Sequence, residues 1–330
     1  MKEPVVSEEF NKFINTIETE EITYDLTEKE KPKSVDISKI EYIKKDANFV
    51  DIPFFSFKKK KYKKINYVFD KEKNIQVEVI AANNQYVPTA FDYKVLNVLL
   101  KYREYYRVKD YFLINAYRIS KELYNNNTTT GGKDLKRITE SIDRLKTTVY
   151  NIYNKYISKV DENEYSLQDV HLMTILTDVS YTDNLLFDDR VYAISFSESF
   201  LNNVKNDYSY ELPVKLMNTI SNPTAQRLYE VIRYSNYDKL NRLSAVLSYD
   251  EIIRKIPLTA NDVRNNKKTI QKLIKELQKQ GFISVFKAKY PKLGYFYVEF
   301  GYADKNTTLD NAEVATTSRR LIEIEAIPYA

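Results

Sequence analysis

Two basic amphipathic helices, each leading into a β-prone segment, constrain the fold of this chain more than any other feature. The first pattern runs from Thr130 to Ile152 (TGGKDLKRITESIDRLKTTVYNI), and a related pattern runs from Lys267 to Val285 (KKTIQKLIKELQKQGFISV). In both patterns apolar residues recur at helical spacing, so each helix can bury one face and present cations on another. At an offset of about 132 residues the apolar positions coincide, with Ile138, Ile142 and Leu145 falling on Ile270, Ile274 and Leu277.

The segments around the two helices are predicted to follow the same order. In the first half the predicted ranges are a helix from Pro88-Thr89 to about Tyr105, a strand at 111–114, a helix at 115–124, a polar turn at 125–132, the basic helix, and a hairpin of 148–158 with 165–179. In the second half they are a helix opened by Asn222-Pro223, a strand at 244–247, a helix from 248 or 249, the basic helix from an Asn261 cap to Gly281, and a hairpin of 282–290 with 295–300. Helix, strand, helix, helix and hairpin is the order of a winged-helix domain. We therefore expect an α+β fold with two tandem winged-helix domains and a flexible acidic N-terminal arm.

The predicted domain boundaries follow changes in composition and pattern. They are 1–45 for the acidic arm, 46–182 for winged-helix domain 1, 183–302 for winged-helix domain 2, and 303–330 for a polar tail. Within domain 1, residues 49–81 are predicted to form three short strands, with the basic turn Lys58–Lys64 after the first. This turn has two interpretations, a contact with the DNA backbone or a lysine-rich turn that protects a sheet edge, and the second is favoured. Residues 180–210 are predicted to bridge the two halves.

Charge is distributed unevenly along the chain. Residues 1–50 carry 8 basic and 12 acidic side chains, whereas residues 51–302 carry 40 basic and 29 acidic ones. A basic body suits a polyanionic partner, because each phosphate that a cation neutralises releases a condensed counterion. The alternative is a solvated surface, which charge alone favours.

Composition excludes several classes of site. The absence of Cys excludes disulfides and thiolate metal sites, and the single His171 excludes a site with several histidines. The first residues have neither the basic start nor the apolar run of a signal peptide. No apolar segment approaches the roughly 20 residues that a membrane helix needs. We expect a soluble, cytoplasmic protein with no membrane association, no metal and no cofactor.

Known catalytic patterns fail to match. A phosphate-binding loop needs Ser or Thr after Gly-Lys, but Asp134 follows Gly132-Lys133, and the first glycine position holds Asn127. A rolling-circle nicking enzyme would need a pair of His residues near a Tyr, and a Ser/His/Asp hydrolase would need His171 as its base. The sequence therefore predicts a protein that is not an enzyme.

The outer faces of the two basic helices supply the candidate DNA-binding residues. They are Lys133, Lys136, Arg137, Thr139, Glu140 and Arg144 in the first helix, Arg264, Asn265, Lys267, Lys268, Gln271, Lys272 and Lys275 in the second, and Lys287 and Lys289 on the hairpin that follows. Arg and Asn near a helix start carry donors for base edges, whereas Lys side chains would mostly hold phosphates. An ordinary amphipathic helix with a solvated face remains the alternative for either helix alone. The repetition with flanking hairpins favours DNA binding.

Six motifs occur in one order between about residue 50 and residue 300. They are Asp51–Phe55, the Pro88-Thr89-Ala90-Phe91-Asp92 segment continued by Val95–Leu100, Gly131-Gly132 before Leu135–Ile138 and Ile142–Leu145, Thr147–Val149, Ala225–Tyr229, and Leu273–Ile283. In this order the sequence resembles the replication initiator protein A family of plasmid initiators. Lys133 and Asp134 after the glycines, and a surface with Lys in place of Arg, depart from the family pattern.

The resemblance implies a protein that binds repeated sequences in the double-stranded DNA of a plasmid origin and helps to open the duplex. It also implies recruitment of host replication proteins such as a helicase or initiator, and a homodimer that represses its own promoter. Two rival readings stay open. One is a winged-helix transcriptional regulator or partition protein without initiator activity, and the other is a nicking enzyme of a different design.

Overall fold

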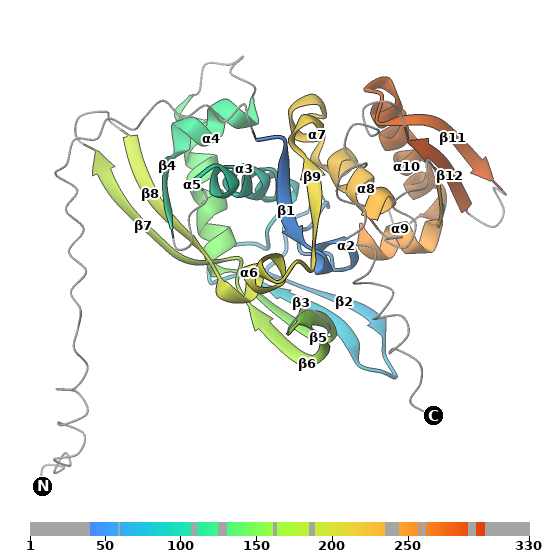
Figure 1. Cartoon of the computed structure of the whole chain (residues 1–330), viewed down its shortest axis with the longest axis horizontal. Helices are drawn as coiled ribbons and strands as arrows, with labels where there is room; N and C mark the ends of the chain where they lie inside the picture. The colour runs from blue at the N-terminus through green and yellow to red at the C-terminus, as the bar shows by residue number, and fades with distance from the viewer. Residues whose placement is uncertain are drawn as a thin grey trace, which may run out of the picture. The chain divides into compact units, whose positions relative to one another are not determined.

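The computed structural model describes residues 40–58, 60–106, 111–124, 131–160, 164–184, 189–234, 244–256, 258, 262–289 and 295–300 (Figure 1). The predicted tail, and the predicted arm as far as residue 39, lie outside the described residues. The last residues assigned to that arm are part of a sheet, because strand β1 (Tyr42–Asp46) pairs antiparallel with β9 (Ser209–Pro213). The described residues all belong to one compact unit, Ile37–Ala330.

The first of two related groups of elements, here called repeat 1, combines helices with a three-stranded antiparallel sheet. It consists of α3 (Ala90–Tyr106), β4 (Phe112–Asn115), α4 (Ala116–Leu123), α5 (Gly132–Thr147), β7 (Leu176–Asn184) and β8 (Asp189–Phe196), with β8 between β4 and β7. Thr89 precedes α3, and its N–H and hydroxyl donate to Asp92 Oδ2 at 2.6 and 2.8 Å. Asn115 caps α4 by accepting from the Arg118 N–H at 2.8 Å. As the spacing predicts, the apolar stripe of α5 is buried, at Ile138, Ile142 and Leu145.

Repeat 2 consists of α8 (Pro223–Tyr234), β10 (Ser244–Ser248), α9 (Tyr249–Lys255), α10 (Val263–Lys279), β11 (Ile283–Lys289) and β12 (Tyr295–Phe300), with β12 between β10 and β11. Ser248 and Glu251 form a reciprocal capping box at the start of α9. The N-cap of α10 is Asp262 rather than the predicted Asn261, which lies outside the described residues. Gly281 follows the helix at φ 80°, a left-handed conformation that glycine adopts without steric cost.

The two repeats share one topology. In each, the strand between the first two helices pairs with the last strand, which also pairs with the strand before it. They differ after the third helix, because repeat 1 carries an inserted hairpin, β5 (Val149–Lys159) and β6 (Tyr165–Met173). This hairpin joins β2 (Lys64–Asp70) and β3 (Ile75–Ile80) in a four-stranded sheet of order β2-β3-β5-β6.

The predicted hairpin of 148–158 with 165–179 forms in part, because β5 and β6 pair as expected but belong to a different sheet. The second predicted strand is too long, since β6 ends at Met173 and residues 176–179 are the start of β7. The strands that complete the sheet of repeat 1 are β7 and β8. The predicted boundary between residues 182 and 183 falls inside β7 and would separate β8 from its partners β4 and β7. Apolar and polar alternation identifies a strand and its buried face, but it does not identify the neighbouring strand.

Residues 49–57 form no strand, which corrects the first of the three strands predicted there. The chain instead forms the short helix α2 (Asn48–Asp51) and then an irregular segment. This turn brings the buried rings of Phe49 and Phe54 into a stack with centroids 4.0 Å apart. The other two predicted strands are β2 and β3.

The first helices of the two repeats pack against each other, since α3 contacts both α5 and α8, and α8 contacts α10 (Figure 1). The connection between the repeats runs through α6 (Glu198–Lys205), β9 and α7 (Val214–Thr219). A buried charge cluster holds this junction together. Glu230 of α8 accepts from Lys45 Nζ at 2.8 Å, from Arg227 at 2.9 Å and from the Tyr93 hydroxyl at 3.0 Å. Burial lowers the pKa of Lys45 and raises the pKa of Glu230.

Candidate nucleic-acid interface

The exposed face of α5 carries four of the six residues predicted there. Lys133, Lys136, Arg137 and Glu140 are exposed. The Arg137 guanidinium carbon lies 3.7 Å from the centroid of the Phe91 ring, at the start of α3. This contact holds the arginine stem in place while its charged group remains accessible, a common arrangement for arginine on an aromatic ring.

Arg144 and Thr139 point toward the protein, which corrects their assignment to the DNA-facing surface. The Arg144 side chain is 4% exposed, and its Nε and Nη2 donate to Asp92 Oδ1 at 3.1 and 2.8 Å. Thr139 is half-buried, and its hydroxyl lies 2.7 Å from the hydroxyl of Tyr192 on β8. Helical periodicity did not separate Arg144 from the exposed cations, because its ion partner lies 52 positions earlier in the chain.

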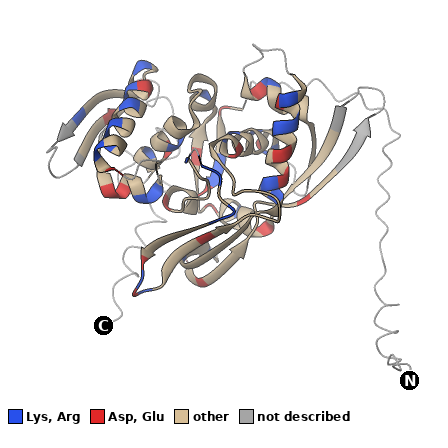
Figure 2. Ribbon diagram, turned by 180° about the vertical axis from the view of Figure 1, so that it is seen from behind, with Lys and Arg blue, Asp and Glu red and all other residues tan. Residues whose placement is uncertain are grey.

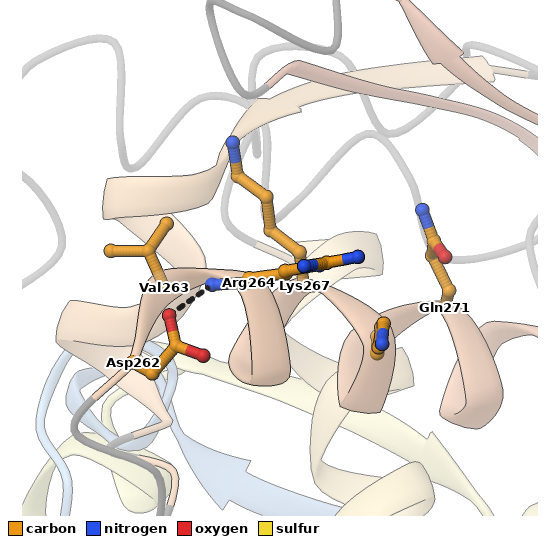
Figure 3. Close-up of a pocket in the computed structure, with 6 residues that line it drawn as sticks. Asp262, Val263, Arg264, Lys267 and Gln271 are labelled. Atoms are coloured by element: carbon orange, nitrogen blue, oxygen red, sulfur yellow. Dashed lines mark hydrogen bonds between the residues drawn. The ribbon is translucent and has the colours of Figure 1, made fainter.

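The second cationic surface lies on α10. Arg264, Asn265, Lys268, Lys272 and Lys275 are exposed, whereas Lys267 and Gln271 are half-buried. Lys267 Nζ lies 5.5 Å from the centroid of the Tyr249 ring on α9. Figure 3 shows residues that line an open hollow over the first turns of the helix, with the Asp262 carboxylate accepting from the Arg264 N–H at 2.9 Å. The six residues that line this hollow are Asp262, Val263, Arg264, Lys267, Lys268 and Gln271.

The hairpin of repeat 2 contributes one further exposed cation. Lys287 on β11 is exposed, and Lys289 is also on β11, although its side chain lies outside the described residues. Figure 2 marks Lys and Arg positions along both α5 and α10.

The cations of the two helices are largely unneutralised. No carboxylate among the described residues lies within ion-pair distance of Lys133, Lys136 or Arg137 on α5, and the same holds for four cations of α10, namely Arg264, Lys268, Lys272 and Lys275. Their charge is therefore available to an anionic partner, and phosphate is the anion that rows of Lys and Arg commonly bind. Asn265 adds an amide that can both donate and accept hydrogen bonds.

Other chemistry has little support within the described part of the chain. No group of three or more His, Asp or Glu side chains gathers there as a metal site would require. His171 lies on β6 with its ring stacked on Tyr156 at a centroid distance of 3.7 Å, and burial lowers its pKa. None of the described helices combines the length and apolar character that a membrane span needs.

Known proteins resemble this arrangement at the level of sequence and of fold. The family profile described as Replication initiator protein A matches residues 44–278, from β1 almost to the end of α10. The chain belongs to the replication initiator protein A family. The match confirms the resemblance inferred from the six ordered motifs. It covers all of repeat 1, and repeat 2 from α8 almost to the end of α10, and it includes Asp92 and Arg144, which meet as a buried ion pair.

Solved structures extend the comparison from sequence to fold. The fold of this family member is similar to a crystal structure of domain 2 and domain 3 of RctB, with a TM-score of 0.53, 15% sequence identity, and coverage of 77% of this chain and 97% of that chain. A second crystal structure, of RctB domains 2–3, aligns with a TM-score of 0.48 and 13% identity over 79% of this chain and 100% of that chain. At 15% identity the first comparison shows a shared mixed α/β fold. No curated protein matches the sequence.

Proposed function

We propose that this protein initiates plasmid replication by binding sequence repeats in double-stranded origin DNA through two tandem winged-helix domains. The observation that carries this proposal is the pair of exposed cationic helices, α5 and α10, in a member of an initiator family. Repeats 1 and 2 correspond to the two domains, since each places its cationic helix third and closes with a three-stranded sheet. A winged-helix domain inserts such a third helix into the major groove.

Two kinds of side chain on α5 and α10 have different roles in DNA recognition. The exposed lysines of α5 and α10 hold phosphates, which positions the protein on the duplex without reading its sequence. Arg137, Arg264 and Asn265 have the donors and acceptors that read base edges. Because α3 and α8 pack against each other between α5 and α10, the two helices would occupy separate grooves.

Initiation in this proposal needs no covalent chemistry, and the protein is not an enzyme. Binding energy from two domains deforms the DNA locally and helps to open the origin. The protein then recruits host replication proteins such as a helicase or initiator, and it forms a homodimer when it represses its own promoter. Incubation of supercoiled origin plasmid with the protein and Mg²⁺ tests the absence of catalysis, because any nicked product would contradict it.

The DNA contacts are tested by titrating the full-length protein with short duplexes that tile the DNA flanking its coding sequence. Arg137→Ala and Lys268→Ala should each weaken specific binding and lower its salt dependence, and the lost phosphate contact of Lys268 should reduce the slope of log K against log salt by about 0.9. Lys215→Ala, an exposed lysine on α7, is the control and should leave the slope unchanged. Wild-type affinity in both Arg137→Ala and Lys268→Ala would contradict the groove assignment.

Footprinting separates the initiator from the regulator or partition protein. Protection of an array of direct repeats supports initiation, and loss of plasmid replication after deletion of that array completes the test. Protection of a lone palindrome, with replication intact after its deletion, would favour the regulator.

A further inference from the structure

Residues 60–64 of the lysine-rich segment, here called the lysine strap, contact residues 81–89, which lead into α3. Next to the strap, Ser56 forms a parallel bridge with Thr89, and its N–H donates to the Pro88 carbonyl at 2.8 Å. Within the strap, the Tyr62 carbonyl accepts from the Val87 N–H at 2.8 Å, and the Lys63 carbonyl accepts from the Ala81 N–H at 2.9 Å. Backbone hydrogen bonds at Tyr62 and Lys63 therefore hold this part of the strap in a defined position.

Three lysines of the strap are free to bind an anion. Lys60, Lys61 and Lys63 are exposed, and no carboxylate among the described residues pairs with them. Lys64 differs because it pairs with Glu78 at 2.7 Å. Lys61 Nζ lies 4.0 Å from the centroid of the Tyr86 ring, which orients this side chain.

Protection of a sheet edge does not account for these lysines. Strand β2 is an edge strand, but it begins at Lys64, so only that lysine lies on it. The Tyr62 and Lys63 carbonyls already accept hydrogen bonds from the N–H groups of Val87 and Ala81. Lys60, Lys61 and Lys63 therefore lie before the edge strand and are not explained by the edge-protecting role that the sequence favoured.

The strap lies beside α5. The Tyr86 ring that orients Lys61 also lies against Arg144 of α5, with the guanidinium carbon 4.4 Å from its centroid. The neighbouring Gln85 accepts from the Thr147 hydroxyl, at the end of α5, at 2.8 Å. The segment that leads into α3 therefore contacts both the strap and α5.

We infer that Lys60, Lys61 and Lys63 bind the sugar-phosphate backbone of double-stranded DNA beside the groove that α5 enters. The inference rests on the proposed function and adds a phosphate site to it. Ammonium groups on a fixed backbone suit a row of phosphates, and such contacts set the position of a protein on DNA without reading bases. The strap should therefore contribute equally to binding of any duplex sequence.

The test measures the salt dependence of full-length protein binding to a mixed-sequence DNA duplex. Lys61→Gln/Lys63→Gln should lower the slope of log K against log salt by about 1.8, since each phosphate contact contributes about 0.9. Lys61→Arg/Lys63→Arg retains both charges and should retain most of the slope. The matched control is Lys71→Gln/Lys73→Gln, which removes two exposed lysines from the β2–β3 turn at the far end of β2. Unfolding temperatures check that all three variants fold.

The possible outcomes distinguish a failure of the strap site from a failure of the proposed function. A wild-type slope in Lys61→Gln/Lys63→Gln, with reduced slopes in Arg137→Ala and Lys268→Ala, would overturn the strap site and leave the proposed function standing. An equal loss in the control pair would also overturn it, because net charge alone would then explain the effect. If the wild-type protein shows no salt-dependent binding to any duplex, the proposed function itself fails.

Discussion

Replacement of Arg144 by Ala separates a stabilising role for this residue from a DNA-binding one. Arg144 donates from two nitrogens to Asp92 Oδ1, at 3.1 and 2.8 Å, and the two side chains are 4% and 0% exposed. Arg144→Ala leaves the Asp92 carboxylate buried without its countercharge, and Asp92 then keeps only the two hydrogen bonds from Thr89. The variant should therefore unfold more easily while its exposed DNA-facing surface stays intact.

The expected cost follows from the burial of the pair. Removing one partner of a buried ion pair costs about 3–5 kcal/mol. For a protein of this size about 1 kcal/mol lowers the Tm by roughly 2–4 °C, so the Tm should fall on the order of 10 °C. Urea and thermal unfolding of the full-length protein, followed by circular dichroism, measure both quantities. Lys136→Ala, at an exposed position of the same helix, is the control and should stay within about 0.5 kcal/mol of the wild type.

A double-mutant cycle assigns the loss to the pair. The Asp92→Ala/Arg144→Ala protein should lose clearly less stability than the two single variants combined, because neither charge is then left alone. Specific DNA affinity, measured well below the Tm of Arg144→Ala, should equal that of the wild type. Wild-type stability together with weakened DNA binding would refute this reasoning and return Arg144 to the DNA surface.

Two further predictions concern buried ionisable groups. Glu230→Gln removes the carboxylate that pairs with the buried Lys45 and Arg227 and should cost about 3–5 kcal/mol in urea unfolding. Unchanged stability would contradict the role of the cluster. His171→Phe tests the pH response: burial lowers the folded pKa of His171, so the unfolded state takes up the proton first and the wild type loses stability as pH falls below about 6.5. His171→Phe should keep the ring stack on Tyr156, and its stability relative to the wild type should rise as the pH is lowered from about 7.5 to about 5.5. A difference in unfolding free energy that does not change with pH would argue against this.

Local features of the fold were predictable because their causes lie close together in the chain. The stripe from Ile138 to Leu145 identifies both the existence of α5 and its buried face. Gly281 marks the end of α10 because its φ of 80° suits glycine, and Ser248 starts α9 through a bond that spans only three residues. The order of helices and strands in repeat 2 was predicted for the same reason. The cap of α10 lay one residue from its predicted place.

Long-range features were not predictable from these local patterns. Residues 148–158 and 165–179 were predicted as a hairpin, but the strand that pairs with this hairpin, β3, lies about 70 or more positions earlier in the chain. A pattern within one segment does not identify such a distant partner. Strand β8 joins repeat 1 by pairing with β4, which lies far earlier in the chain, and the periodicity of a single segment does not identify such a partner.

The sequence by itself determined the long helices α3, α5, α8 and α10, the faces that they bury, and the family that the chain resembles, because periodicity, caps and ordered motifs are local properties. Only the tertiary structure decided which cations reach solvent. Arg144 has the charge and helical spacing of a DNA contact, yet Asp92 draws it into the protein, whereas the backbone of residues 81–87 holds the lysine strap so that Lys60, Lys61 and Lys63 stay exposed. A charge becomes a binding group or a buried partner according to neighbours that are distant in the chain.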